Sequence, residues 1–183
     1  LIELQRNKQA SSDNLTEHVE SISNVSSDDS NLERLNRWNC AISLFKERPM
    51  MGWGPGTYQF VYAPFQEARY QTIISTNNSD GGNAHSEYLG PLAEQGIFGP
   101  FFVLLLLWYV CVLGFRLWNE VKDIETRNLA VGVYLGLMTY FIHGVLNNYL
   151  DTDKASAPFW GFIALLVVLD IELREQKKKA ITS

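Results

Sequence analysis

The chain has 183 residues, of which 46% are hydrophobic, and its 15 Lys and Arg against 20 Asp and Glu give a formal net charge of -5. A net negative chain without a basic stripe lacks the electrostatic signature of a nucleic-acid-binding protein, and two cysteines are too few for a disulfide scaffold or a four-ligand zinc site. Residues 97–183 carry 8 acids and 8 bases around long uncharged runs, which also excludes an ordinary soluble single domain.

Residues 1–31 are rich in Ser, Asn and Asp and poor in aromatic side chains. A segment of this composition cannot bury enough apolar surface to fold alone, so we expect a polar linker or loop here. The chain begins at Leu1 without the basic and apolar regions of a signal peptide. We therefore expect it to be the C-terminal part of a longer protein.

A helix is expected from Ser30 to about Glu47. Ser30 and Glu33 have the spacing of a capping box, and Pro49 prevents the helix from continuing. Four apolar side chains recur at helical spacing and are expected to form the buried face: Leu35, Trp38, Ile42 and Phe45. The opposite face is then expected to consist of Asn36, Asn39, Ser43 and Lys46.

Two arginines of this helix are candidate anion ligands. Arg34 falls about 40° from the centre of the predicted apolar face, and Arg37 falls on its edge. The Arg34 side chain either extends along the apolar surface to water or points inward at an anionic ligand. The helical pattern alone leaves both alternatives open.

The stretch 49–56 (PMMGWGPG) is expected to end the helix in a tight turn, in which the glycines give backbone freedom and Trp53 gives a flat apolar platform. Its glycine spacing is not that of a nucleotide-binding loop, because no strand precedes it and no Gly-Lys-Ser/Thr follows it. Five aromatic residues follow between Tyr58 and Tyr70. Such rings either lie among lipid headgroups or stack on sugars.

The segment 83–96 (NAHSEYLGPLAEQG) is expected to form a short helix that ends at Gly96, with His85 at or near its start. At this position the helix dipole would disfavour the charged imidazole and leave the neutral form that a general base requires. Capping of the helix by Asn83 or Ser86 is the alternative explanation for these polar residues. Two acidic residues are expected to be solvated, Glu87 and Glu94.

Three uncharged runs predict transmembrane helices, at about 97–117, 128–148 and 155–173. In the second run, Gly132 and Gly136 have the GxxxG spacing that suits close helix packing in lipid. The third run has only 15 uncharged residues, so it spans the membrane only if Asp170 lies at the interface or faces protein.

The basic residues predict the orientation of these helices. The loop between the first two runs has three Lys or Arg and the tail after the third has four, whereas the loop between the second and third has Lys154 alone. By the positive-inside rule the first loop and the tail are cytoplasmic, which places residues 1–96 outside. We therefore expect an all-α, multi-pass membrane fragment with an extracytoplasmic loop domain over 32–96, three C-terminal transmembrane helices within 97–175 and a basic cytoplasmic tail over 174–183.

The order of these motifs resembles that of the O-antigen ligase/polymerase family of multi-pass membrane proteins. The resemblance rests on Arg34-x3-Trp38-x2-Ala41, then ERPMMGWGPGTYQF, then NAHSEYLGPLAEQGIFG ahead of a transmembrane run. It covers about residues 33–115, and these motifs are specific in combination. Ser86 is a departure, since an Asn is common at this place in the family.

The resemblance implies transfer of a polyprenyl-diphosphate-linked glycan to a hydroxyl of a glycan or lipid acceptor, with inversion and without a metal or other cofactor. It also implies a place in surface-polysaccharide assembly at the bacterial cytoplasmic membrane. Arg34 matches the family arginine, suited to neutralise a diphosphate leaving group, and His85 matches the loop histidine, suited to take the acceptor proton. Four further residues are expected to contact substrate: Arg37, Arg48, Arg69 and Trp53.

Several alternatives remain open at this point. An O-antigen polymerase, a lipid A-core ligase and a protein glycosylase share these motifs and differ in their acceptor. A non-enzymatic transporter or accessory protein is the alternative from another class, and a transporter is expected to carry polar or broken helices at mid-membrane. The three runs have few such features apart from His143 in the second run. It is expected to be a buried ionisable group, and so either a functional residue or a partner in helix packing.

Overall fold

The computed structural model describes residues 29–71, 75, 82–151 and 153–182, so the predicted linker lies outside the described residues except at its end, where α2 begins. All secondary structure in the described part of the chain is helical, which confirms the predicted all-α class. The α-helices are α2 (Asp29–Glu47), α3 (Tyr58–Val61), α4 (Leu89–Gln95), α5 (Phe98–Glu120), α6 (Ile124–His143) and α7 (Asp153–Thr182), and two short 3-10 helices are η1 (Ala63–Phe65) and η2 (Tyr149–Asp151).

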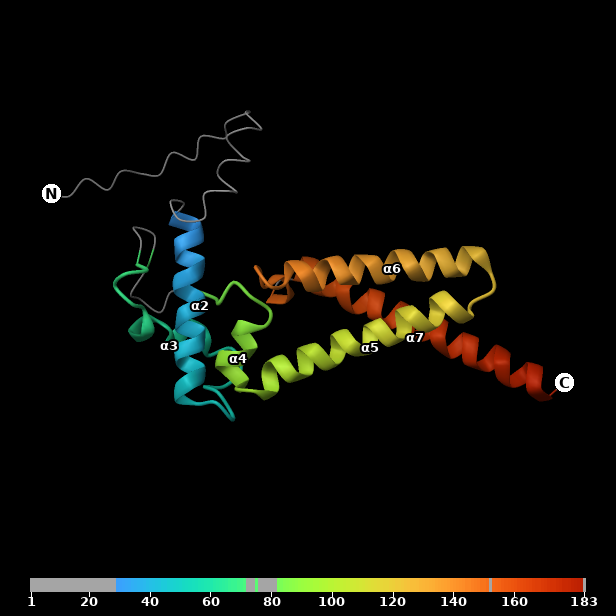
Figure 1. Cartoon of the computed structure of the whole chain (residues 1–183), viewed down its shortest axis with the longest axis horizontal. Coiled ribbons are helices and arrows are strands. Elements are labelled where there is room, and N and C mark those ends of the chain that lie inside the picture. Colours follow the sequence, from blue (N-terminus) through green and yellow to red (C-terminus); the bar gives the residue numbers. More distant parts are fainter. Residues whose placement is uncertain (1–28, 72–74, 76–81, 152, 183) are drawn as a thin grey trace, which may run out of the picture.

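The helices form two packed units (Figure 1). The long helices α5, α6 and α7 pack against one another as a bundle, and α2 lies across one end of this bundle together with α4. Each unit has its own apolar core, centred on Leu113 and Leu137 in the bundle and on Leu44 and Tyr62 in the N-terminal unit (residues 29–96). Because α4 leads almost directly into α5, the N-terminal unit is held at the end of the bundle.

Among the residues that the structure describes, two helices, α5 and α7, are long and apolar enough to cross a membrane. The second predicted run, 128–148, is helical only as far as His143, after which the chain turns at Gly144 toward the N-terminal unit. There the backbone N–H of Glu87 donates to the Gly144 carbonyl at 2.8 Å. The helix α7 continues through most of the basic tail to Thr182. A membrane crossing by α6 stays a prediction.

The acidic side chain in the third predicted run, Asp170, is buried in the bundle. Arg116 of α5 donates to its carboxylate at 3.0 Å, and Arg174, one turn further along α7, lies 2.7 Å from the other carboxylate oxygen. A charge inside an apolar bundle is stable only when it is paired. Asp170 therefore faces protein, which is one of the two conditions under which the sequence allowed this helix to span.

The two glycines expected to mediate helix packing, Gly132 and Gly136, are exposed on α6. A Cβ atom added at Gly132 would have no atom within 4 Å. The close approach in the bundle lies instead at Gly114 of α5, where a Cβ would stand 2.4 Å from the ring of Tyr134. The prediction is therefore wrong for the described bundle, because an aromatic ring on a small residue, and not the GxxxG pair, makes the close contact between α5 and α6.

The buried face of α2 is not the predicted one. Leu35 and Ile42 are each 37% exposed, whereas Asn36 is fully buried. At 100° per residue the observed face lies about 150° around the helix from the predicted one. Its buried members are Glu33, Asn36, Arg37, Cys40, Ala41 and Leu44. The prediction failed because polar side chains of this face bond to one another in the interior, which a count of apolar residues cannot register.

The turn at 49–56 packs on the C-terminal end of α4. The backbone N–H of Gly54 donates to the Glu94 carbonyl at 2.7 Å. The Glu94 carboxylate in turn accepts from the backbone N–H groups of Gly56 and Tyr58, at 2.8 and 3.0 Å. Glu94 is therefore a structural tie between the turn and α4, and the prediction that it is solvated is wrong.

Two glycines allow this packing. Gly52 and Gly96 both have a φ of 64°, which favours glycine. A Cβ atom at Gly52 would stand 2.3 Å from the backbone carbon of Glu94, and one at Gly96 would stand 2.5 Å from that of Met50. The end of α2, the end of α4 and the start of α5 therefore meet backbone to backbone, and α4 ends at Gly96 as predicted.

Candidate functional site

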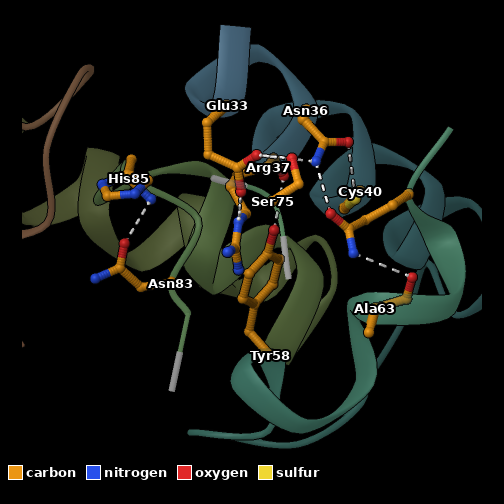
Figure 2. Close-up of polar contacts among 10 residues, drawn as sticks. Glu33, Asn36, Arg37, Cys40, Tyr58, Ala63, Ser75, Asn83 and His85 are labelled. Carbon is orange, nitrogen blue, oxygen red and sulfur yellow. Dashed lines mark hydrogen bonds and ion pairs between the residues drawn. The ribbon is translucent and has the colours of Figure 1, made fainter. Parts of the chain in front are cut away.

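A cluster of polar side chains lies inside the N-terminal unit, between α2 and the segment that precedes α4 (Figure 2). Its centre is the buried carboxylate of Glu33, which accepts hydrogen bonds from Arg37 Nε at 2.6 Å, from Asn36 Nδ2 at 3.3 Å and from the Ser75 hydroxyl. The sequence assigned Glu33 to a capping box at the start of α2. In the structure its carboxylate anchors Arg37 instead.

The Arg37 guanidinium is held from three sides. Besides the Glu33 carboxylate, the ring of Tyr62 lies under it with 3.9 Å from Cζ to the ring centroid. The backbone of Gly82 is so close that a Cβ there would stand 1.8 Å from Nη1. This Nη1 atom is buried without a hydrogen-bond partner among the described residues. Since a buried N–H without a partner is unfavourable, it is a donor that a ligand could satisfy.

A second unpartnered donor lies close by on α2, at Arg34. The Arg34 Nη1 atom donates to the side-chain oxygen of Asn31 at 3.2 Å, and its Nε atom is buried without a partner in the described part of the chain. Two guanidinium groups with unused buried N–H atoms therefore lie less than one turn apart on the same helix. Such a pair is suited to bind a doubly charged anion.

His85 lies in the segment before α4 and has a φ of 48°, the one positive value for a non-glycine in the described residues. Its backbone N–H donates to Asn83 Oδ1 at 3.1 Å (Figure 2). Its carbonyl accepts from Trp38 Nε1 at 3.4 Å. The left-handed conformation is unfavourable for histidine by about 1–2 kcal/mol. Strain of this kind is concentrated at functional positions in proteins.

The environment of His85 favours its neutral form. Burial lowers the pKa of the imidazole below its ordinary value, and the positive charges of Arg34 and Arg37 lower it further. The sequence predicted the same direction from the dipole of α4, but α4 begins only at Leu89. The predicted cause is therefore wrong. The hydrogen bond from Trp38 of α2 to the His85 carbonyl, and the contact of nearby Gly82 with Arg37, place His85 in the same region of the unit as the two arginines.

Local capping accounts for the neighbours of His85. Asn83 accepts from the backbone of His85, as described above, and Ser86 Oγ accepts from the backbone N–H groups of Tyr88 and Leu89 at 3.3 Å each. Both residues therefore shape the segment that carries the imidazole. Ser86 caps the start of α4 as predicted, whereas Asn83 forms a turn with His85 ahead of the helix and does not cap it.

Glu87 connects this segment to the bundle and was missed as a site residue. Its carboxylate accepts from the Tyr140 hydroxyl at 2.6 Å and from the backbone N–H of Leu150 at 2.8 Å. The prediction that Glu87 is solvated is therefore wrong. The partners lie 53 and 63 residues away in sequence, so no local pattern could have identified them.

The remaining predicted site residues lie away from the cluster. Arg48 stacks over the Trp53 ring at 3.9 Å, and it stands about 21 Å along α2 from Arg34. The Trp53 indole N–H donates to the Leu44 carbonyl of α2 at 3.0 Å, and the partly buried ring packs against the core of the unit. Arg69 is exposed and pairs with Glu67 at 2.5 Å. The structure thus brings Arg34, Arg37 and His85 into one region. Arg48, Trp53 and Arg69 lie outside it.

A polar cavity of about 540 Å³ borders the same segment. Its wall includes Gly82, which abuts Arg37, and Asn83, which bonds to His85. His143 does not belong to this region, because it is exposed as the last residue of α6 and so is not the buried group that was predicted. Among the described residues no group of three His, Cys, Asp or Glu could hold a metal ion. The cluster is suited to bind an anion and to accept a proton.

Comparison with known proteins identifies the family. A sequence model of the O-antigen ligase family matches residues 2–104, more than half of the chain, and this stretch holds the whole N-terminal unit. A shorter similarity is to the chloroplastic ATP synthase subunit b of Anthoceros angustus, 43% identical over 54 residues, which covers 30% of this chain and 28% of that protein. No solved structure matches significantly. The chain belongs to the O-antigen ligase family, a family of glycan ligases and polymerases.

Proposed function

We propose that this protein transfers a glycan from a polyprenyl diphosphate to an acceptor hydroxyl, with inversion, at the extracytoplasmic face of the bacterial inner membrane. The observation that carries the proposal is the pair of buried, unpartnered guanidinium N–H donors of Arg34 and Arg37 in the same region as His85, whose pKa is lowered. A diphosphate leaving group requires cationic donors, and an acceptor hydroxyl requires a base. This arrangement supplies both.

The proposed reaction is a single displacement. The acceptor oxygen attacks the anomeric carbon while its proton passes to the neutral imidazole of His85. The bond between the anomeric carbon and the diphosphate oxygen breaks on the opposite face, which inverts the configuration. The diphosphate leaves with the bonding electron pair, and Arg34 and Arg37 stabilise its charge through N–H donors that are already in place. No metal ion takes part in this scheme.

The cavity beside the cluster is the proposed site for sugar. It is lined mainly by polar groups and by backbone, including Gly82, Asn83 and Ser86. Arg37 and His85 do not themselves line this cavity, but two of its lining residues contact them: Gly82 abuts the Arg37 guanidinium, and Asn83 accepts from the His85 backbone N–H. Arg48, Trp53 and Arg69 would then contact more distant parts of the lipid or the glycan.

The contacts of the bundle favour catalysis over transport. A transporter is expected to carry polar or broken segments at mid-membrane. The charges that α5 and α7 bring together, Arg116 and Asp170, pair with each other at 3.0 Å. These two charges therefore neutralise each other within the bundle, and the groups proposed for catalysis lie in the N-terminal unit.

The test uses the complete protein in membrane vesicles, supplied with a polyprenyl-diphosphate-linked glycan. In the variant His85→Asn, transfer should fall by about 10²-fold or more, because an amide cannot take the acceptor proton. Asn tolerates a positive φ, so the fold of the segment should remain. The matched control is His143→Asn, which changes an exposed histidine at the end of α6 and should leave transfer unchanged.

Three acceptors offered separately distinguish the possible activities: lipid A-core for a ligase, a second glycan repeat for a polymerase, and a protein for a glycosylase. Full transfer by His85→Asn with every acceptor would overturn the assignment of the base. A thiol-labelling map that placed residues 32–96 in the cytosol would overturn the proposed location.

A further inference from the structure

The turn that follows α2 exposes two adjacent methionines. Met50 is 61% exposed and Met51 is 75% exposed. Single exposed apolar side chains are common on proteins, but a contiguous group of large ones marks a contact with another apolar phase or molecule. The question is what covers these two side chains.

The position of the turn relative to a membrane is fixed by its contacts with the start of α5. The backbone N–H of Ile97 donates to the Pro49 carbonyl at 2.9 Å. A Cβ at Gly96 would stand 2.5 Å from the backbone of Met50. Since α5 is long and apolar enough to cross a bilayer from Phe98 onward, the turn stands at the level where this helix enters the membrane.

The two methionines continue an exposed apolar surface of α5. Ile97, directly before that helix, and Phe98 and Phe101 in its first turn are all exposed large apolar side chains. We call the set Met50, Met51, Ile97, Phe98 and Phe101 the entry patch. Because its α5 members lie at the end of a membrane-crossing helix, lipid is the apolar phase available to the whole patch.

The polar flank of the turn has the composition of a membrane interface. Arg48 precedes it and stacks on the Trp53 ring at 3.9 Å, and the Arg48 side chain is exposed. Trp at the headgroup level and Arg beside anionic headgroups are typical of the membrane–water interface. In addition, α2 lies across the bundle and not along it (Figure 1), so the turn at its end can reach the bilayer surface while α2 stays outside.

We propose that Met50 and Met51 insert into the lipid leaflet that the N-terminal end of α5 reaches, with Arg48 at the phosphate headgroups. The partner is the bilayer surface itself. The inserted turn attaches the N-terminal unit directly to the lipid, in addition to its connections to the bundle, and it holds α2 parallel to the membrane. This inference goes beyond the proposed function and requires only that α5 crosses the membrane.

The test measures the depth of position 51 in the complete protein, reconstituted in phosphatidylethanolamine and phosphatidylglycerol vesicles. In a background without native cysteines, Met51→Cys carries an environment-sensitive fluorophore. Nitroxide groups placed high on the lipid acyl chains should quench this label strongly, and iodide in the aqueous phase should quench it weakly. A depth of about 5–10 Å below the headgroups is expected for such an insertion.

The matched control is Ala68→Cys with the same label. Ala68 is exposed, and the segment 66–71 lies on the side of α2 away from the bundle (Figure 1). This label should show the reverse pattern, with strong quenching by iodide and weak quenching by the lipid nitroxide. If position 51 behaves like position 68, the turn lies in water and the proposal fails. If position 51 is shielded from both quenchers, protein covers the turn and the proposal fails equally.

Discussion

At His85, backbone geometry and electrostatics act on the same side chain. The Asn83 side chain accepts from its backbone N–H at 3.1 Å and so supports a left-handed conformation that histidine adopts reluctantly. Burial and two nearby guanidinium groups lower the pKa of its ring. A half-buried histidine near two cations is unfavourable for stability, which is understandable if the position is kept for chemistry.

The first prediction concerns the pH dependence of transfer. Only the neutral imidazole can take a proton, so activity should be full above the pKa of His85 and should fall as the pH drops through it. Because the charge of Arg34 is one cause of the lowered pKa, Arg34→Gln should raise that pKa. The acid limb of the pH profile of kcat/KM should therefore move to higher pH, together with a lower plateau from weaker binding of the diphosphate.

The measurement is the residual transfer rate of Arg34→Gln from pH 4 to pH 8 (roughly the range over which histidines titrate). Arg69→Gln is the control, since Arg69 is exposed and pairs with Glu67 outside the cluster. Its acid limb should coincide with that of the unmodified protein. If the acid limb of Arg34→Gln stays in place, the pH profile does not follow the titration of a histidine whose pKa Arg34 lowers, and the assignment of His85 as the base fails.

At the scale of single elements, the turn after α2 gives the clearest prediction, because two of its glycines differ in surroundings but not in conformation. Gly52 and Gly56 have φ values of 64° and 73°. A Cβ at Gly52 would stand 2.3 Å from the backbone of Glu94, whereas a Cβ at Gly56 would have nothing within 4 Å. Gly56→Ala should therefore be destabilising by about 1 kcal/mol from its conformation alone. Gly52→Ala should be destabilising by several-fold more, since backbone must move.

Amide hydrogen exchange of α4 in the detergent-solubilised protein measures this difference. Protection of the α4 amides should fall strongly in Gly52→Ala and only slightly in Gly56→Ala. Equal losses of amide protection in the two variants would mean that the backbone at Gly52 does not pack against α4 as the structure describes.

The elements themselves could largely be predicted, whereas the face that each one buries could not. Uncharged runs predicted the long helices, and Gly96 predicted the end of α4. The rule that a charge in an apolar run must face a partner correctly anticipated Asp170. The buried face of α2 escaped prediction because Glu33, Asn36 and Arg37 bond to one another and, in part, to residues distant in sequence. Periodicity counts apolar side chains, and it cannot recognise an interior in which polar groups bond to one another.

At the scale of the whole molecule, the candidate site depends on how the N-terminal unit is attached to the bundle. The chain connection through α4 and α5 is one attachment, and the contacts around Glu87 are another. Tyr140 donates to the Glu87 carboxylate from α6, and Tyr88 donates to the Phe141 carbonyl at 2.9 Å. These contacts hold the segment that carries His85 against the end of α6. The sequence could not reveal them, because the partners belong to separate predicted regions.

The last prediction tests this attachment with Tyr140→Phe, which removes one hydroxyl and leaves the ring in place against Phe159. A hydrogen bond to a charged group contributes about 1.5–3 kcal/mol, so its loss should free the segment before α4 and lower kcat for transfer by about tenfold or more. Exchange of amides in residues 83–95 should accelerate while exchange in α5 stays unchanged. Tyr134→Phe is the control, because its hydroxyl donates to Cys111 Sγ at 3.8 Å inside the bundle, away from the Glu87 contacts, and it should alter neither readout. Faster exchange without a loss of transfer would show that the Glu87 contact holds the segment but is not needed for catalysis. Unchanged exchange would show that the Glu87 contact does not hold the segment.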